Sequence, residues 1–186
     1  MCLQSIVEGG FKGKNYIQLR KEIIETYGLE QIKTFNTLER NGMLINRDAQ
    51  AKGKPIFNWG NLRASMKLIN TEYNKERPDS SCYAYTGYKP ISVRLVEMAL
   101  GGEWRGIAGD EQLKRIPGSR QIQDPPKDRD TNKRRVVMVY MIGGLAYSEI
   151  SALRMTAVLW DIELIICTTS IVNYKKLITA IAEPVY

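Results

Sequence analysis

The sequence predicts a chain of the α/β class, an α+β arrangement in which a helical N-terminal part precedes a strand–helix–strand–helix segment. Two observations lead to this prediction. Over residues 15–73, apolar residues recur every three or four positions, which is the spacing of helices that bury one face. After residue 135, two short runs of consecutive apolar residues alternate with helical patterns, as buried parallel strands do in α/β proteins.

The N-terminal helices are predicted from three apolar stripes, which we interpret as core. The first stripe ends at Gly28, which can close its helix in a left-handed conformation, and the second ends at Gly42. The third predicts one continuous helix over residues 59–73 with a single apolar seam. The stripes consist of Tyr16, Leu19, Ile23 and Tyr27, then Ile32, Phe35 and Leu38, then Trp59, Leu62, Met66, Ile69 and Tyr73.

The middle of the chain no longer shows the long apolar stripes and predicts shorter helices followed by a linker. Pro90 stands where the first turn of a helix tolerates a residue without an N–H, and Gly101 with Gly102 stops that helix. A short helix is predicted at 110–116. Residues 119–135 alternate in charge and include two consecutive prolines, which indicates a flexible linker.

The last part predicts a strand over 136–142, a helix, a second strand over 163–169 and a final helix over 174–181. A parallel sheet normally has more than two strands and helices on both faces. Two strands alone would leave open edges, which natural proteins avoid. We therefore expect either that the chain is a fragment of a larger protein or that other chains complete its sheet.

Composition narrows the classes of function. The 186 residues include 27 Lys and Arg against 20 Asp and Glu, a net charge of +7. This charge favours nucleic acid or a membrane surface as a partner, but basic and acidic residues are mixed between 110 and 135 instead of forming a dense basic stripe. Histidine is absent, which excludes Ser-His-Asp and Cys-His catalysis and most zinc sites.

The remaining compositional signals indicate a cytosolic protein. The three cysteines form no CxxC pair, so we interpret them as reduced, packed thiols instead of a disulfide framework or a metal site. Neither a signal peptide nor an apolar run of membrane-spanning length is predicted.

Two consecutive glycines after the first predicted strand raise the possibility of a phosphate-binding loop. A dinucleotide loop needs G-x-G-x-x-G and a P-loop needs G-x-x-x-x-G-K-[ST]. The stretch from Gly143 to Ser148 has neither the third glycine nor the lysine, and Leu145 and Tyr147 would crowd a phosphate. The spacing of Ala146 and Glu149 is that of a capping box without its hydroxyl. We predict that the glycines form a structural turn and hold no cofactor.

Two longer motifs carry a family resemblance. "IGGLAYSEISALR" (142–154) resembles the signature near the C-terminus of the SM family, the Sec/Munc-eighteen-type regulators of vesicle fusion, with Ala146 where that family usually has Thr. "YAYTGYKPISVRLVE" (83–97) resembles a second segment of the same family. "CLQSI" (2–6) and "RKEIIETYGLEQIKTFNTLERNGML" (20–44) are similar to its vacuolar-sorting class-C branch.

The resemblance implies the C-terminal portion of a large arch-shaped protein. Residues 1–118 would belong to its helical third domain, 119–135 to a linker, and 136–186 to a Rossmann-like second domain whose sheet the full-length parent completes. It also implies a non-catalytic adaptor at late endosome, vacuole or lysosome membranes, which it reaches through partners. Those partners are the α-solenoid class-C subunit of the HOPS and CORVET tethering complexes and, through the full-length parent, SNAREs, because the SNARE-templating hairpin of the family lies upstream of Cys2.

The resemblance further implies a contact surface for the solenoid. Arg20, Leu29 and Ile32 match a basic residue, a Tyr and an Ile of the vacuolar branch, and Leu29 keeps the apolar anchor while losing a hydroxyl. Leu29 and Ile32, three residues apart, are expected to share one face of the second helix. An apolar pair beside a long cation suits the centre of an interface. The competing interpretation places Ile32 in the core and Arg20 in solvent.

Two other classes of function stay open. Residues 27–45 have the helix–turn–helix rhythm of a winged-helix nucleic-acid-binding domain, although the predicted reading helix offers only Thr34, Asn36 and Thr37 as polar base readers. A small enzyme would have to rely on carboxylates such as Asp128 and Asp130, which lie in the predicted linker.

Overall fold

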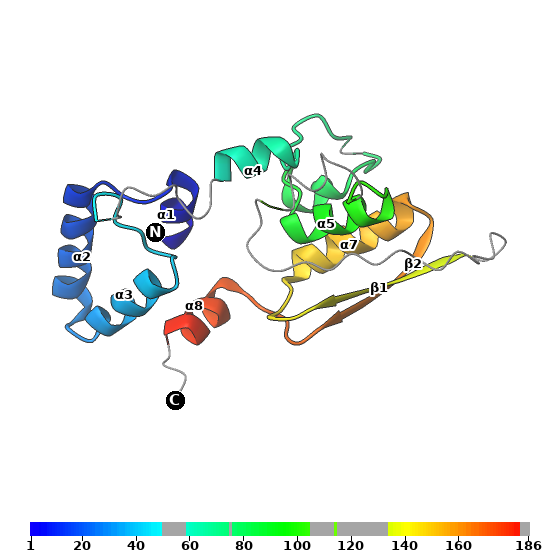
Figure 1. Cartoon of the computed structure of the whole chain (residues 1–186). Helices are drawn as coiled ribbons and strands as arrows, with labels where there is room; N and C mark the ends of the chain where they lie inside the picture. Colours follow the sequence, from blue (N-terminus) through cyan, green and yellow to red (C-terminus); the bar gives the residue numbers. More distant parts are fainter. Residues whose placement is uncertain (50–58, 75, 105–113, 115–133, 183–186) are drawn as a thin grey trace. The chain divides into compact units, whose positions relative to one another are not determined.

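The computed structural model of the chain describes residues 1–49, 59–74, 76–104, 114 and 134–182 (Figure 1). The chain forms two compact units: a helical unit, Met1–Leu62 with Asn173–Tyr186, and a sheet unit, Arg63–Val172. The predicted helix at 110–116 and most of the predicted linker lie outside the described residues. The predicted division at 118 and 135 concerns the domains of a longer protein and stays a prediction.

The helical unit contains α1 (Cys2–Glu8), α2 (Gly13–Tyr27), α3 (Gln31–Arg40) and α8 (Tyr174–Ala182). Its core consists of the buried side chains of Tyr16, Phe35, Leu38 and Leu44. Ile178 and Ile181 of α8 pack against this core, and α8 lies beside α3 (Figure 1). The last helix of the predicted strand–helix–strand–helix run is therefore packed in the helical unit.

The first apolar stripe is buried along only part of its length. Tyr16 is 4% exposed, whereas Tyr27, predicted to be core, is 66% exposed. The buried residues of α3, Phe35 and Leu38, lie in the middle and second half of that helix, and no residue of its first turn, which follows α2 most closely in the chain, is buried. Gly28 ends α2 with φ 100° and ψ 166°, a positive φ that glycine permits but not the left-handed helical conformation predicted.

The predicted single helix over 59–73 is wrong. Helix α4 covers only Trp59–Ser65, because Lys67 adopts a positive φ of 51° and ends it. The amide of Lys67 donates to the carbonyl of Ala64, and the amide of Leu68 donates to that of Arg63, the pair of bonds that closes a helix C-terminus. Glycine usually takes this position, so a lysine gave no signal in the sequence. Ile69 is consequently 47% exposed and pairs with Tyr88 in an antiparallel bridge.

In the sheet unit, a short 3-10 helix and α5 precede two parallel strands joined by α7. Helix α5 begins after Pro90 and ends before Gly101, as predicted. Both strands begin one residue earlier than predicted, and their register pairs Val139 with Ile166. The elements are η1 (Ser81–Tyr85), α5 (Ile91–Leu100), β1 (Arg135–Met141), α7 (Tyr147–Leu159) and β2 (Ile162–Thr168).

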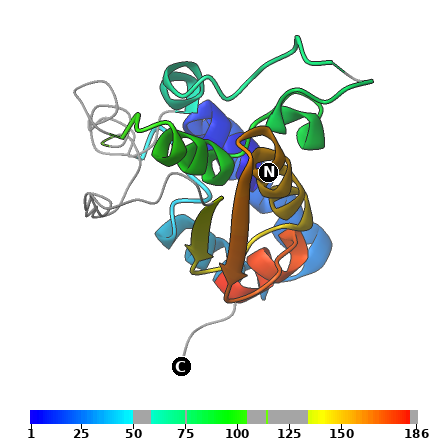
Figure 2. The same cartoon turned by 90° about the vertical axis from the view of Figure 1, so that its right-hand side faces the viewer.

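Helices α5 and α7 cover the same face of the two strands (Figures 1 and 2). Val139 and Ile162 point into the core that these helices share. The opposite face carries Val136, Met138 and Tyr140, which alternate with the inward residues and are 58–65% exposed. The chain is thus a mixed α/β structure with a two-stranded parallel sheet that has one helix-covered face and one apolar, exposed face, the incomplete sheet that the sequence predicts.

Candidate docking surface

Arg20 is held between α2 and α3 instead of being free in solvent. Its guanidinium donates to Glu39 (3.1 Å) and to the side-chain oxygen of Asn36 (3.0 Å), and it lies 5.9 Å from the centre of the Phe35 ring. The side chain is 31% exposed. Arg20 therefore reaches the surface with its orientation fixed by three residues of α3.

Glu39 receives a second donor from the core. The hydroxyl of Tyr16 donates to the same carboxylate oxygen that accepts from Arg20. Burial, followed by the hydrogen bond and charge of Glu39, raises the pKa of Tyr16 above its ordinary value of 10.0. Tyr16 is thus a neutral donor at physiological pH, and one carboxylate joins the core residue Tyr16 to the half-buried Arg20.

Leu29 and Ile32 lie together at the bend between the helices. Leu29 precedes α3 instead of lying on it, and it is 74% exposed. Its carbonyl accepts from the amide of Ile32 (3.0 Å), and Ile32 is half-buried in the first turn of α3. Asn36 is four residues after Ile32, hence on the same face of α3, and it accepts from Arg20. Ile32 is thus neither fully core nor fully exposed, and the three predicted residues border one surface.

A second apolar stripe on α2 extends this surface. Ile17, Arg20, Ile24 and Tyr27 are spaced by three, four and three residues, so they line one side of the helix. Ile17 and Tyr27 are 65% and 66% exposed. Ile17 and Ile24 were not predicted to belong to this surface and Tyr27 was predicted to be core, although the sequence contains this spacing beside the core stripe. We define the docking surface as Ile17, Arg20, Ile24, Tyr27, Leu29 and Ile32.

Helix α3 would be the reading helix of the winged-helix alternative. Phe35 and Leu38 of α3 are buried, and the Asn36 side chain already accepts from Arg20. The exposed basic side chains of α3 are Lys33 and Arg40. These two cations can contact phosphates, but of the three polar side chains predicted to read bases, Asn36 accepts from Arg20 and the hydroxyl of Thr37 donates to the Lys33 carbonyl.

The glycine loop of the sheet unit is a structural turn. Gly143 and Gly144 have φ of 105° and 123°, and a Cβ on Gly144 would lie 2.4 Å from Val172. The amide of Gly143 donates to the Thr169 hydroxyl, and that of Leu145 donates to the Ser170 carbonyl. A phosphate loop needs such amides free to face the ligand, and these are satisfied within the chain.

Glu149 joins the two family motifs. One of its carboxylate oxygens accepts from the amide of Ala146 (2.8 Å), the half of the capping box that the sequence predicts. The other accepts from the hydroxyl of Ser92 at the start of α5 (2.6 Å). Tyr85 and Ser148 are hydrogen-bonded beside it. Hydrogen bonds between the two motifs, from Ser92 to Glu149 and from Ser148 to Tyr85, therefore hold η1, α5 and α7 together.

Among the helices that the structure describes, none has the length and apolarity needed to cross a membrane. The described side chains also contain no group of three His, Cys, Asp or Glu residues arranged to hold a metal ion.

Comparison of the sequence with known proteins assigns the chain to a family. The sequence profile described as the Sec1 family matches residues 1–180. The chain is 35% identical to vacuolar protein sorting-associated protein 33A of Rattus norvegicus over 98% of its own length and 31% of that relative. It is 32% identical to vacuolar protein-sorting-associated protein 33 homolog of Arabidopsis thaliana, over 98% of the chain and 32% of the relative.

A third relative matches the chain to a similar extent. Vacuolar protein sorting-associated protein 33 of Schizosaccharomyces pombe is 31% identical over 97% of the chain and 32% of the relative. The chain thus spans about a third of the length of these relatives. The match confirms the resemblance carried by residues 83–97 and 142–154, and the chain belongs to the Sec1 family.

Proposed function

We propose that the chain is part of a non-catalytic adaptor in vesicle docking and fusion, the SM subunit of a vacuolar or late-endosomal tethering complex. Its relatives are named for vacuolar protein sorting. The chain docks on the α-solenoid class-C subunit of the HOPS and CORVET complexes, and the full-length protein supports SNARE assembly. The protein works in the cytoplasm and is held at late endosome, vacuole or lysosome membranes by these partners. The docking surface is the observation that carries the proposal.

The apolar residues of the docking surface supply a driving force for binding. Leu29 is 74% exposed, and Ile17 and Tyr27 are nearly as open to solvent. Fully burying a side chain of this size contributes about 1.5–3 kcal/mol. Such residues, grouped on one side of a helix and its following bend, are typical of a protein–protein interface and not of a freely solvated face.

The ordered Arg20 lowers the entropic cost of docking. Its bonds to Glu39 and Asn36 already restrict the side chain in the free protein. Glu39 also offsets much of its charge, because the two groups lie 3.1 Å apart. Binding through this surface should therefore depend on apolar contact more than on net charge and should change little with salt.

The geometry of the surface suits a helical partner. Ile17, Arg20, Ile24 and Tyr27 form a ridge along α2 at the three- and four-residue spacing with which helices interdigitate. An α-solenoid presents parallel helices with grooves between them. The ridge would enter one groove, and Leu29 with Ile32 would contact the adjoining helix.

Leu29→Lys tests the proposal without disturbing the core. The variant should bind the C-terminal α-solenoid segment of the class-C subunit at least about 2 kcal/mol more weakly, roughly 30-fold, because a hot-spot anchor becomes a charge. The matched control is Leu3→Lys on α1, since Leu3 is 75% exposed and lies outside the docking surface. Isothermal titration calorimetry measures both dissociation constants.

Ile32→Lys should weaken binding as well, and circular dichroism would show whether this half-buried position tolerates the change. Equal affinities of the Leu29→Lys and Leu3→Lys variants would contradict the docking surface. If wild-type binding to the solenoid segment is lost as salt is raised, charge and not apolar contact drives the binding. Such salt dependence is the behaviour expected of a nucleic-acid-binding surface.

A further inference from the structure

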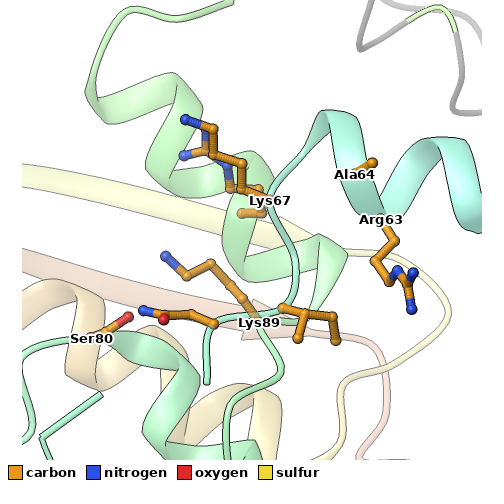
Figure 3. Close-up of a pocket in the computed structure, with 8 residues that line it drawn as sticks. Arg63, Ala64, Lys67, Ser80 and Lys89 are labelled. Atoms are coloured by element: carbon orange, nitrogen blue, oxygen red, sulfur yellow. The ribbon is translucent and has the colours of Figure 1, made fainter. Parts of the chain in front are cut away.

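A basic cavity of about 780 Å³ lies within the sheet unit (Figure 3). Arg63 and Ala64 come from α4, Lys67 from the turn that ends α4, and Ser80 and Lys89 from the segments before η1 and α5. Arg94 of α5 also lines the cavity. A cavity of this size is within the range of small-molecule sites in proteins, and its polar lining is dominated by cations.

The walls of the cavity are fixed by backbone bonds. The amide of Lys89 donates to the carbonyl of Leu68 (2.8 Å), so the segments that carry Lys67 and Lys89 are paired. Asn70 donates to Gly87 in the same way, at 2.8 Å. The Nε of Arg94 donates to the Met66 carbonyl (3.1 Å) and ties α5 to the same turn. Four cationic residues therefore line one cavity, on segments that are hydrogen-bonded to one another.

Two of these cations have counter-charges. Glu97, which is buried, accepts from Lys89 (2.6 Å) and from the hydroxyl of Ser81 (2.6 Å). Arg94 pairs with Glu103 at 2.7 Å and lies 3.8 Å from Glu97. These two carboxylates neutralise about as much charge as Lys89 and Arg94 carry.

The other two cations of the cavity, Arg63 and Lys67, have no counter-charge among the described residues. Arg63 and Lys67 are both exposed, and neither forms an ion pair with a carboxylate anywhere in the part of the chain that the structure describes. The side-chain oxygen of Asn70 already accepts from the backbone amide of Glu72, which leaves the side-chain NH₂ group of Asn70 to donate. The cavity thus combines uncompensated positive charge with neutral donors.

We propose that this cavity binds a compact polyphosphate anion, an ester with two or more phosphates close together, either free or as the headgroup of a lipid. Arg63 and Lys67 would neutralise the phosphates, with the guanidinium offering two parallel N–H donors to one phosphate. Lys89, Asn70 and Ser80 would bind the remaining oxygens. The cavity exceeds the space that one phosphate needs, which favours a ligand with several. This site is separate from the docking surface and does not depend on the proposed partner.

The test uses inorganic pyrophosphate as the probe and the double variant Arg63→Gln/Lys67→Gln. Both side chains are exposed and unpaired within the described residues, so the variant should keep its fold. The matched control is Lys14→Gln/Lys33→Gln, which removes the same charge from exposed positions of the helical unit. Calorimetry should give saturable binding that the double variant weakens at least tenfold and the control variant less than threefold.

A second arm identifies the source of the phosphates. Phosphatidylcholine vesicles with and without a phosphoinositide bisphosphate are sedimented with each variant. Capture that needs the phosphoinositide, is inhibited by pyrophosphate and is lost in the double variant assigns the site to a lipid headgroup. Pyrophosphate binding without capture assigns it to a free anion. No pyrophosphate binding, or an equal loss in the double and control variants, would overturn the proposal.

Discussion

Replacing Glu97 by alanine should lower the free energy of unfolding of the sheet unit by about 3 kcal/mol. The Glu97 side chain is only 8% exposed, and its carboxylate accepts from Ser81 and Lys89 at 2.6 Å each. Lys89 and Arg94 are 18% and 15% exposed. Alanine would leave a buried hydroxyl and at least one poorly hydrated ammonium without an acceptor.

The size of the loss in unfolding free energy depends on which contacts Lys89 and Arg94 keep when Glu97 is removed. Removing one member of a buried ion pair costs about 3–5 kcal/mol because the other charge stays buried and unpaired. The value here should lie at the low end, because Arg94 keeps its 2.7 Å contact with Glu103 and Lys89 keeps some contact with solvent. Glu103→Ala is the control: the Glu103 side chain is 50% exposed, and a pair of this kind contributes less than about 1 kcal/mol.

Urea unfolding followed by circular dichroism measures both variants against the wild-type chain. The slope with denaturant should be unchanged, so the difference appears in the midpoint. Glu97→Gln, which keeps the size and one acceptor oxygen, should fall between the wild type and Glu97→Ala. An equal effect of Glu97→Ala and Glu103→Ala would refute the reasoning, because burial would then add nothing to the pair.

Two further predictions concern other parts of the chain. Gly144→Ala should cost about 2 kcal/mol or more, because its φ is positive and a Cβ would meet Val172 at 2.4 Å; Gly102→Ala, where nothing lies within 4 Å, should cost less in the same urea assay. Tyr16→Phe should cost about 1 kcal/mol at pH 8. The raised pKa of Tyr16 means that wild-type stability falls as pH rises above about 10, where the unfolded chain loses the tyrosine proton first. The stability of the Tyr16→Phe variant should fall less steeply with pH than that of the wild type. An equal dependence of stability on pH in the two proteins would contradict the raised pKa of Tyr16.

Local chemistry explains which parts of the fold could be predicted from the sequence. The strands were predicted within one residue, because consecutive apolar residues between turn signals have few alternatives. The turn at Gly143 and the capping role of Glu149 were predicted because both depend on residues close together in the chain.

Tertiary context decided the rest. The end of α4 was missed because Lys67 takes a conformation usually reserved for glycine. The exposure of Tyr27 depends on where α3 places its buried residues, which periodicity within α2 does not contain. The bonds from Arg20 to Asn36 and Glu39 were also not predicted, although Arg20 itself was selected. The basic cavity is lined by residues between 63 and 94 that backbone pairing brings together, and no local sequence motif predicts it.

The most direct test of the central claim is a calorimetric titration of this chain with the C-terminal α-solenoid segment of the class-C tethering subunit at two salt concentrations. We expect submicromolar binding that changes little with salt, is weakened roughly 30-fold by Leu29→Lys and is retained by Leu3→Lys. Absence of binding by a chain that circular dichroism shows to be folded, or undiminished binding by Leu29→Lys, would contradict it.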